Sequence, residues 1–167
     1  MTNTCHLYAF ALAATLLVSA AKAEAEEFGT IEEAKTMLDR AIVQVKADKS
    51  RAFEMFNSSD PRFHDRDLFV FCFGARDGKF TAHESMVTHD VRKLSDSAGR
   101  LFGERMFAEA REGHTLEISY LSPFPGTTFH VPRRAFVTRA ADQICGVSAY
   151  VYNGPGSPNE YVGSSPY

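Results

Sequence analysis

Residues 67–84 constrain the fold of this chain more than any other segment. Residues 68–73 are apolar at both alternations, which is typical of a strand buried on both faces of a sheet. Asp77-Gly78 follows, and this dipeptide favours a tight hairpin turn. A second strand is predicted to start at Phe80 and to end at His83. The segment therefore predicts the opening β-hairpin of a mixed helix and sheet fold.

A long amphipathic helix is predicted before this hairpin, over residues 30–57. Thr30 and Glu33 have the spacing of a capping box, in which each residue satisfies a backbone donor near the other. Apolar residues then recur at steps of three and four, as on one face of a helix. They are Ile31, Ala34, Leu38, Ala41, Ile42, Val45, Ala52, Phe53 and Phe56. The polar run 57–61, which closes with a proline, ends the helix.

The second half of the chain predicts a short helix and three more strands. The helix is expected over residues 100–112, after a polar loop with one helical turn over 86–97. Its inward-facing residues are expected to be Leu101, Met106, Phe107 and Ala110. The strands are expected at 115–121, 134–139 and 143–152, with a turn at 123–126 between the first two.

This order of elements predicts an α+β fold. Its centre is a five-stranded antiparallel sheet, with the long N-terminal helix and the short helix packed on one side. The short helix and the loops between the second and third strands are expected to cover a pocket. A length of 167 residues with 44% apolar residues suits one domain, predicted over residues 24–152.

The two ends of the chain are predicted to lie outside this domain. Residues 1–23 are typical of a signal peptide, since the apolar run 7–20 is short for a membrane span and Ala21-Lys22-Ala23 suits signal peptidase. An uncleaved anchor is the alternative. The mature protein is expected to be periplasmic or secreted, with no membrane insertion after cleavage. Residues 153–167 are rich in Gly, Pro and Ser and predict a disordered tail.

Composition and spacing argue against several functions. With 18 basic and 21 acidic residues, the chain has no field that attracts phosphates, so nucleic-acid binding is not expected. The histidines lack metal-ligand spacing, and the serines and aspartates lie in no catalytic motif, so no metal, cofactor or enzymatic activity is predicted. Two cysteines follow the signal peptide, Cys72 and Cys145, which permits one disulfide or two free thiols.

Five short blocks between residues 31 and 152 resemble the single Cache domains of type 2, the extracytoplasmic sensory relatives of the PAS fold. The blocks are Asp67-Leu68-Phe69-Val70-Phe71 with Asp77-Gly78 and Ala82-His83, Met86-Val87-Thr88-His89-Asp90-Val91, Tyr120-Leu121-Ser122-Pro123, Pro132-Arg133-Arg134-Ala135-Phe136-Val137, and Cys145-Gly146-Val147-Ser148-Ala149-Tyr150. The chain departs from the family pattern at Glu84, His89, Tyr120, Ala135 and Phe136. Ala135 and Phe136 each lack a hydroxyl that the family pattern carries.

The resemblance implies a PAS-like sheet that holds a small metabolite, such as a short organic acid. It implies that Arg133 binds the carboxylate, that Tyr120 and Phe136 enclose the carbon skeleton, and that His83 orients the ligand. For Arg133 and its neighbour Arg134 the alternative is a solvated pair, and for His83 it is a loop cap. In the PAS-like strand order the first and last strands are adjacent, which implies a disulfide between Cys72 and Cys145.

Two main functions are therefore weighed. The first is a stand-alone ligand-binding domain that presents its bound state to a membrane kinase or chemoreceptor. The second is a ligand-free module that docks on a receptor or dimerises through its N-terminal helix. A third, a metal or haem carrier, would need folding to gather the histidines.

Overall fold

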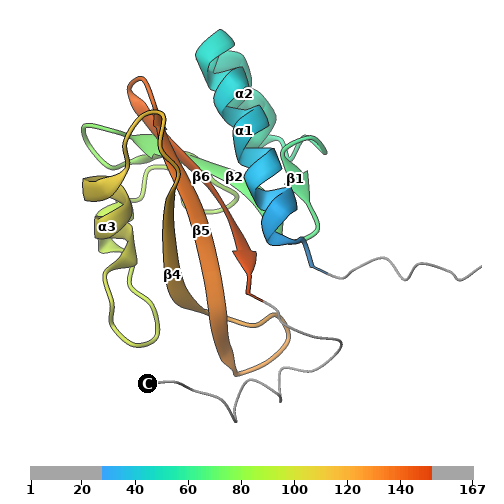
Figure 1. Cartoon of the computed structure of the whole chain (residues 1–167), viewed down its shortest axis with the longest axis vertical. Helices are drawn as coiled ribbons and strands as arrows, with labels where there is room; N and C mark the ends of the chain where they lie inside the picture. Colours follow the sequence, from blue (N-terminus) through green and yellow to red (C-terminus); the bar gives the residue numbers. More distant parts are fainter. Residues whose placement is uncertain (1–27, 152–167) are drawn as a thin grey trace, which may run out of the picture.

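An antiparallel sheet lies between two helical layers in the computed structural model, which describes residues 28–151 (Figure 1). Its strands are β1 His64–Asp65, β2 Leu68–Gly74, β3 Phe80–Ala82, β4 Leu116–Pro123, β5 His130–Ala140 and β6 Gln143–Tyr150. They follow the order β1-β2-β6-β5-β4, and β3 also pairs with β2. The five predicted strands are thus present, with the first and last side by side, and the short β1 is added.

The N-terminal helical region is divided into two helices. α1 Ile31–Ala47 begins with the predicted capping box of Thr30 and Glu33, and α2 is Lys49–Asn57. The prediction of one continuous helix is wrong at Asp48, whose backbone is extended (φ −155°, ψ 97°). The Asp48 side chain accepts a hydrogen bond from Arg51 N and so starts a new helix.

The second helical layer lies on the opposite face of the sheet from α1 and α2 (Figure 1). It comprises the 3-10 turn η1 Val91–Lys93 and α3 Phe102–Glu109. The expectation that the helices pack on one side is therefore wrong. Leu101, predicted to face inward, is 49% exposed, because it precedes α3 rather than lying within it.

Successive side chains of β2 point alternately into the two layers on either side of the sheet. Leu68, Val70 and Cys72 pack beneath α1 and α2. Phe69, Phe71 and Phe73 face η1 and α3. Because successive side chains of a strand point to opposite faces, a strand that is apolar at every position needs a cover on each side. The run 68–73 thus required the two-sided arrangement.

A disulfide links the two central strands. Cys72 of β2 lies directly opposite Cys145 of β6, and their Cα atoms are 4.1 Å apart. Both residues are fully buried in the layer beneath α1. The predicted pairing is confirmed in the structure.

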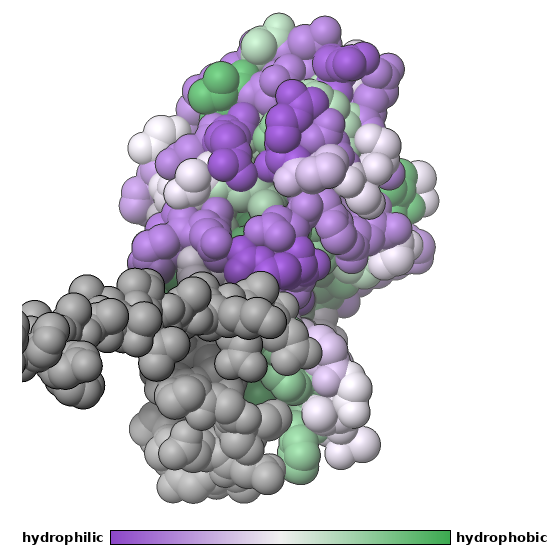
Figure 2. Space-filling model, turned by 90° about the vertical axis from the view of Figure 1, so that its right-hand side faces the viewer, coloured by the Kyte–Doolittle hydropathy of each residue, from purple (hydrophilic) through white to green (hydrophobic). Residues whose placement is uncertain are grey.

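The outer surface of α1 and α2 is mainly hydrophilic (Figure 2). On α1, Val43 is the large apolar residue that is exposed, and it stands alone there among the described residues. Within residues 28–151, no helix is both long and apolar enough to cross a membrane. The predicted signal peptide, 1–23, and the predicted tail, 153–167, lie outside the described residues.

Candidate ligand-binding site

A cavity of about 240 Å³ lies between the sheet and the layer that contains α3. Its floor comes from the sheet and its roof from the segment 80–106. The lining residues are Phe69, Phe71, Phe80, His83, Met86, Leu94, Phe102, Met106, Tyr120, Ser122, Arg133 and Ser148. Most of them are apolar or aromatic, and a few polar groups stand among them, which is the usual make-up of a small-molecule site.

Close packing between β2 and β6 shapes the floor of this cavity. Phe71 lies opposite Gly146, and a β-carbon at Gly146 would come within 2.5 Å of the Phe71 ring. The glycine therefore lets the ring lie against β6. The Phe71 ring in turn lies 6.3 Å from the Phe80 ring, between centroids, in an edge-on arrangement.

Arg133 belongs to the cavity wall, whereas Arg134 does not. Arg133 shares the cavity face of β5 with Ala135 and Val137, and its side chain is 12% exposed. Arg134 lies on the other face and forms an ion pair with Glu117, with 3.6 Å between Nη1 and Oε2. The structure thus decides which member of the arginine pair points inward.

The Arg133 guanidinium is held from one side. Nη2 donates to the Asp67 carbonyl oxygen at 2.8 Å and to the Ser148 carbonyl oxygen at 3.2 Å, and lies 3.4 Å from Asp67 Oδ2. The guanidinium carbon is 4.5 Å from the centroid of the Tyr150 ring. Nε is buried and has no hydrogen-bond partner among the described residues. An unpartnered buried donor is costly, so this arrangement of Arg133 lowers the stability of the fold.

Asp67 connects Arg133 to the start of α1. Its Oδ1 accepts a hydrogen bond from Gly29 N at 2.7 Å, next to the helix cap at Thr30. Burial raises the pKa of the Asp67 carboxyl, while the bond from Gly29 and the charge of Arg133 act in the opposite direction. The carboxylate therefore offsets part of the arginine charge at the cavity.

Tyr120 lies opposite Arg133 in the β4–β5 ladder and forms a flat wall of the cavity. Its ring stacks on Phe102, with centroids 4.2 Å apart and planes 8° from parallel. Burial raises the pKa of the Tyr120 hydroxyl, although the charge of Arg133 and the neighbouring Ser148 lower it in part. The hydroxyl therefore keeps its proton at neutral pH.

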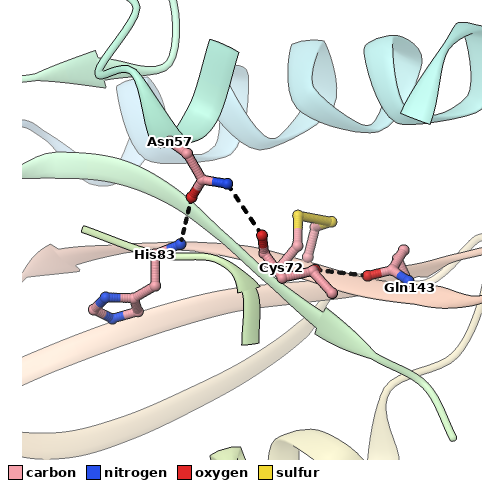
Figure 3. The surroundings of a disulfide bond; sticks show 6 residues. Asn57, Cys72, His83 and Gln143 are labelled. Atoms are coloured by element: carbon pink, nitrogen blue, oxygen red, sulfur yellow. Dashed lines mark hydrogen bonds between the residues drawn. A yellow bond between two sulfur atoms is a disulfide. The ribbon is translucent and has the colours of Figure 1, made fainter. Parts of the chain in front are cut away.

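His83 follows β3 and is positioned by α2. Asn57, the last residue of α2, accepts a hydrogen bond from His83 N and donates to the Thr81 carbonyl oxygen, and Thr81 Oγ1 donates to Gln143 (Figure 3). The His83 ring extends away from the helices (Figure 3). It lies in edge-on contact with Phe69 and Phe80. These bonds hold the short β3 in place at the cavity.

The His83 ring also has a defined proton position. Burial lowers its pKa, helped by Arg133 and opposed by Glu84, so the ring is neutral at pH 7. Nδ1 accepts a hydrogen bond from Ser85 N at 3.1 Å, which leaves the proton on Nε2. The structure thus shows that His83 caps a loop, and it places the His83 ring in the cavity wall.

Phe136 corrects one prediction. It was expected to enclose the ligand, but it is fully buried on the opposite face of the sheet, beneath α1, with Lys35 Nζ 4.8 Å from its ring centroid. The reason is the two-residue period of a strand, because residues 133 and 136 are separated by an odd number of positions. This odd separation can be read from the sequence, and it suffices to predict that Arg133 and Phe136 face opposite sides of the sheet.

Sequence reasoning also missed much of the cavity wall. Phe102 and Met106 come from α3, Ser148 from β6, and Asp67 supports Arg133 from just before β2. The alternation of β6 places Ser148 on the same face as Gly146, which was a usable signal. Within the described residues no group of three His, Cys, Asp or Glu side chains could hold a metal ion.

Comparisons with protein-family models and with curated proteins find no match. Solved structures do match. One is described as "Structural basis for carboxylic acid recognition by a Cache chemosensory domain", with a TM-score of 0.50 at 15% identity over 72% of this chain and 88% of that chain. Another, a periplasmic sensor domain of a chemotaxis protein, has a TM-score of 0.49 at 19% identity over 72% of this chain and 90% of that chain. The first similarity confirms the PAS-like fold predicted from the sequence.

Proposed function

We propose that this chain, which has the fold of the Cache sensory domains, captures a small organic acid in the cavity beside Arg133. The observation that carries the proposal is the Arg133 guanidinium, the one permanently charged group among the described residues that line a mainly apolar cavity. A charged donor in such surroundings favours an anionic guest.

Three polar groups of the wall have a part in this capture. The ligand carboxylate pairs with the Arg133 guanidinium. The Tyr120 hydroxyl and the Nε2–H of His83 are further donors that orient the ligand. The stacked rings of Tyr120 and Phe102 cover the carbon skeleton on one side.

The proposal extends to location and partners. A disulfide between two buried cysteines is typical of an oxidising compartment, and residues 1–23 are typical of an export signal, so we place the protein in the periplasm or outside the cell. There it presents the bound state to a membrane kinase or chemoreceptor. A solved structure of similar fold, described as recognising carboxylic acids, supports the ligand class.

Thermal unfolding in the presence of small carboxylates tests the proposal. A ligand at 100 times its Kd adds about 2.7 kcal/mol, which raises the Tm by about 10 °C for a domain of this size. Arg133→Ala should weaken binding by about 10- to 100-fold, as expected for the loss of a charged hydrogen bond. Arg134→Ala is the matched control, because that residue is adjacent in sequence and lies on the opposite face.

Two outcomes would contradict the proposal. If no carboxylate raises the Tm, the ligand-free interaction module becomes the better reading. If Arg133→Ala and Arg134→Ala weaken binding equally, the effect is one of net charge and the cavity is not the site. Because Arg133→Ala leaves Asp67 buried without its partner, Arg133→Lys serves as a second variant that retains the charge.

A further inference from the structure

Three polar residues of the cavity lie on neighbouring strands of its wall. Tyr120 and Arg133 are directly paired between β4 and β5, and Ser148 lies one strand further, on β6. Gly146, two residues along β6 on the same face, is covered by the Phe71 ring instead. Beyond it the wall is apolar, with Phe71, Phe80 and Met106 in one buried cluster. The cavity therefore has a polar part and an apolar part.

The charges at the cavity nearly cancel. Arg133 is the one permanently charged side chain among the described lining residues, and the Asp67 carboxylate lies 3.4 Å from its Nη2. His83, the other ionisable group with a basic nitrogen in the wall, is neutral at pH 7. One ligand carboxylate can be accommodated at the Arg133 guanidinium. The other described lining residues offer a second carboxylate no counter-ion.

The size of the cavity sets a further limit. An engineered cavity of about 150 Å³ in another protein holds one benzene molecule. At about 240 Å³, this cavity has room for a benzene ring and a carboxylate together. A two-carbon acid would leave most of the apolar part empty.

Building on the proposed function, we infer that the cavity selects monocarboxylates with an apolar body, aromatic or branched, and that Asp67 is the residue that excludes dicarboxylates. The carboxylate lies at Arg133 and Tyr120, and the body extends between Phe71, Phe80 and Met106. Neither the ligand preference nor the role of Asp67 follows from the fold itself.

Isothermal titration with four sodium salts tests the ligand class. Each methylene that becomes buried should tighten binding by about fourfold, so phenylacetate should bind at least about 30-fold more tightly than acetate. Butanoate and succinate have the same number of carbons, and succinate should bind about tenfold or more weakly, because its second carboxylate is buried without a partner. The neutral 2-phenylethanol, which matches phenylacetate in shape, should bind far more weakly than phenylacetate.

Asp67→Asn tests the source of the charge selectivity. The amide keeps an oxygen for Gly29 N but removes the negative charge beside Arg133. At an effective dielectric constant of about 20, this loss should raise the ratio of succinate to butanoate affinity by about tenfold. Asp65→Asn is the matched control, because it removes one carboxylate two residues away that pairs with Arg66 at the exposed surface, and it should leave the ratio unchanged.

The outcomes separate this inference from the proposed function. If acetate or succinate binds as tightly as phenylacetate, capture of organic acids stands and the inference is overturned. If Asp67→Asn and Asp65→Asn change the ratio equally, the selectivity does not come from Asp67 and that part is overturned. If none of the salts binds, the proposed function fails, and the inference fails with it.

Discussion

Titratable residues are buried at the cavity, and one of them, His83, makes the stability of the fold depend on pH. Its ring packs edge-on against Phe69 and Phe80, close enough to Arg133 for the guanidinium charge to oppose protonation. The folded state therefore binds a proton at this ring less readily than the unfolded state does. Since the unfolded chain takes up the proton first, this residue reduces stability as the pH falls.

We expect His83 to make the free energy of unfolding decrease as the pH falls below about 6.5, the usual pKa of histidine. Above that pH both states are neutral and the effect vanishes. His83→Phe keeps an aromatic ring and should flatten the profile between about pH 7.5 and 5.5 in urea titrations. His130→Phe, at an exposed position of β5, should not. If the stability of His83→Phe falls with pH as steeply as that of the unmodified protein, His83 is not the group responsible.

At the level of helices and strands, a connecting segment helps to position the roof of the cavity. The segment 94–102 carries Leu94 and Phe102 of the cavity wall, and Asp96 fixes it to the sheet. The Asp96 side chain is fully buried, and it accepts hydrogen bonds from the backbone N–H groups of Ala98, Arg100 and Leu121. Arg100 Nε adds a fourth bond at 2.8 Å. One carboxylate thus joins the roof to β4.

Asp96→Asn should lower the free energy of unfolding by about 1 to 3 kcal/mol and weaken ligand binding, because the amide replaces one acceptor oxygen and leaves Arg100 without its counter-ion. Burial raises the pKa of Asp96, but its bonds with Arg100 and Leu121 outweigh burial and leave the pKa below its usual value. The stability it adds is therefore present above about pH 4 and is lost as the pH falls through the folded-state pKa.

Chemical unfolding of the unmodified protein and of Asp96→Asn, above and below about pH 4, measures the difference in their free energies of unfolding. Glu109→Gln is the control, since Glu109 forms an exposed pair with Arg105 that contributes little. Equal stability of Asp96→Asn and the unmodified protein at pH 7 would show that the roof is held by other contacts.

A second connection, at Asp48, divides the N-terminal helical layer into α1 and α2. Asp48 ends α1 and caps α2, so a pattern with one continuous apolar stripe folds as two helices. The second helix then brings Asn57 beneath β3, where it bonds to both Thr81 and His83 (Figure 3). The break therefore contributes to the position of a cavity residue on the other side of the sheet.

At the scale of the whole molecule, the disulfide joins strands that are far apart in sequence. Cys72 and Cys145 are separated by 73 residues, and the segment between them contains β3, η1, α3, β4 and β5. Closing so long a loop restricts the unfolded chain, which in the chain-entropy model stabilises the folded state by about 4 kcal/mol. The bond thus constrains nearly all of the cavity wall.

Reduction of this disulfide, or the double substitution Cys72→Ala and Cys145→Ala, should lower the Tm by about 10 to 20 °C. Calorimetry with and without dithiothreitol measures the shift, and a thiol titration verifies that reduction is complete. The same reductant should leave the double variant unchanged. A fully reduced protein with the original Tm would mean that the packing of β2 against β6 suffices without the bond.

Local sequence patterns predict most helices and strands and the hairpin, because capping, turn chemistry and apolar periodicity act over a few residues. The capping box at Thr30, the turn at Asp77-Gly78 and the strand of β2 all lie where local patterns predict them. The two-residue period even implies that Arg133 and Phe136 face opposite ways, although it does not say which of them faces the cavity. Those patterns are short-range, so they carry no information on what covers each face.

Packing of the whole chain sets which helices cover which face of the sheet and which residues meet in the cavity. Arg133 meets Asp67 across 66 residues and stands in one wall with Ser148 and Phe102, which come from β6 and α3. Such neighbours are brought together by burying the apolar faces of all layers at once, a free-energy balance over the whole chain that no local segment contains. For the same reason the inward position of Arg133, and not of Arg134, is a property of the packed sheet.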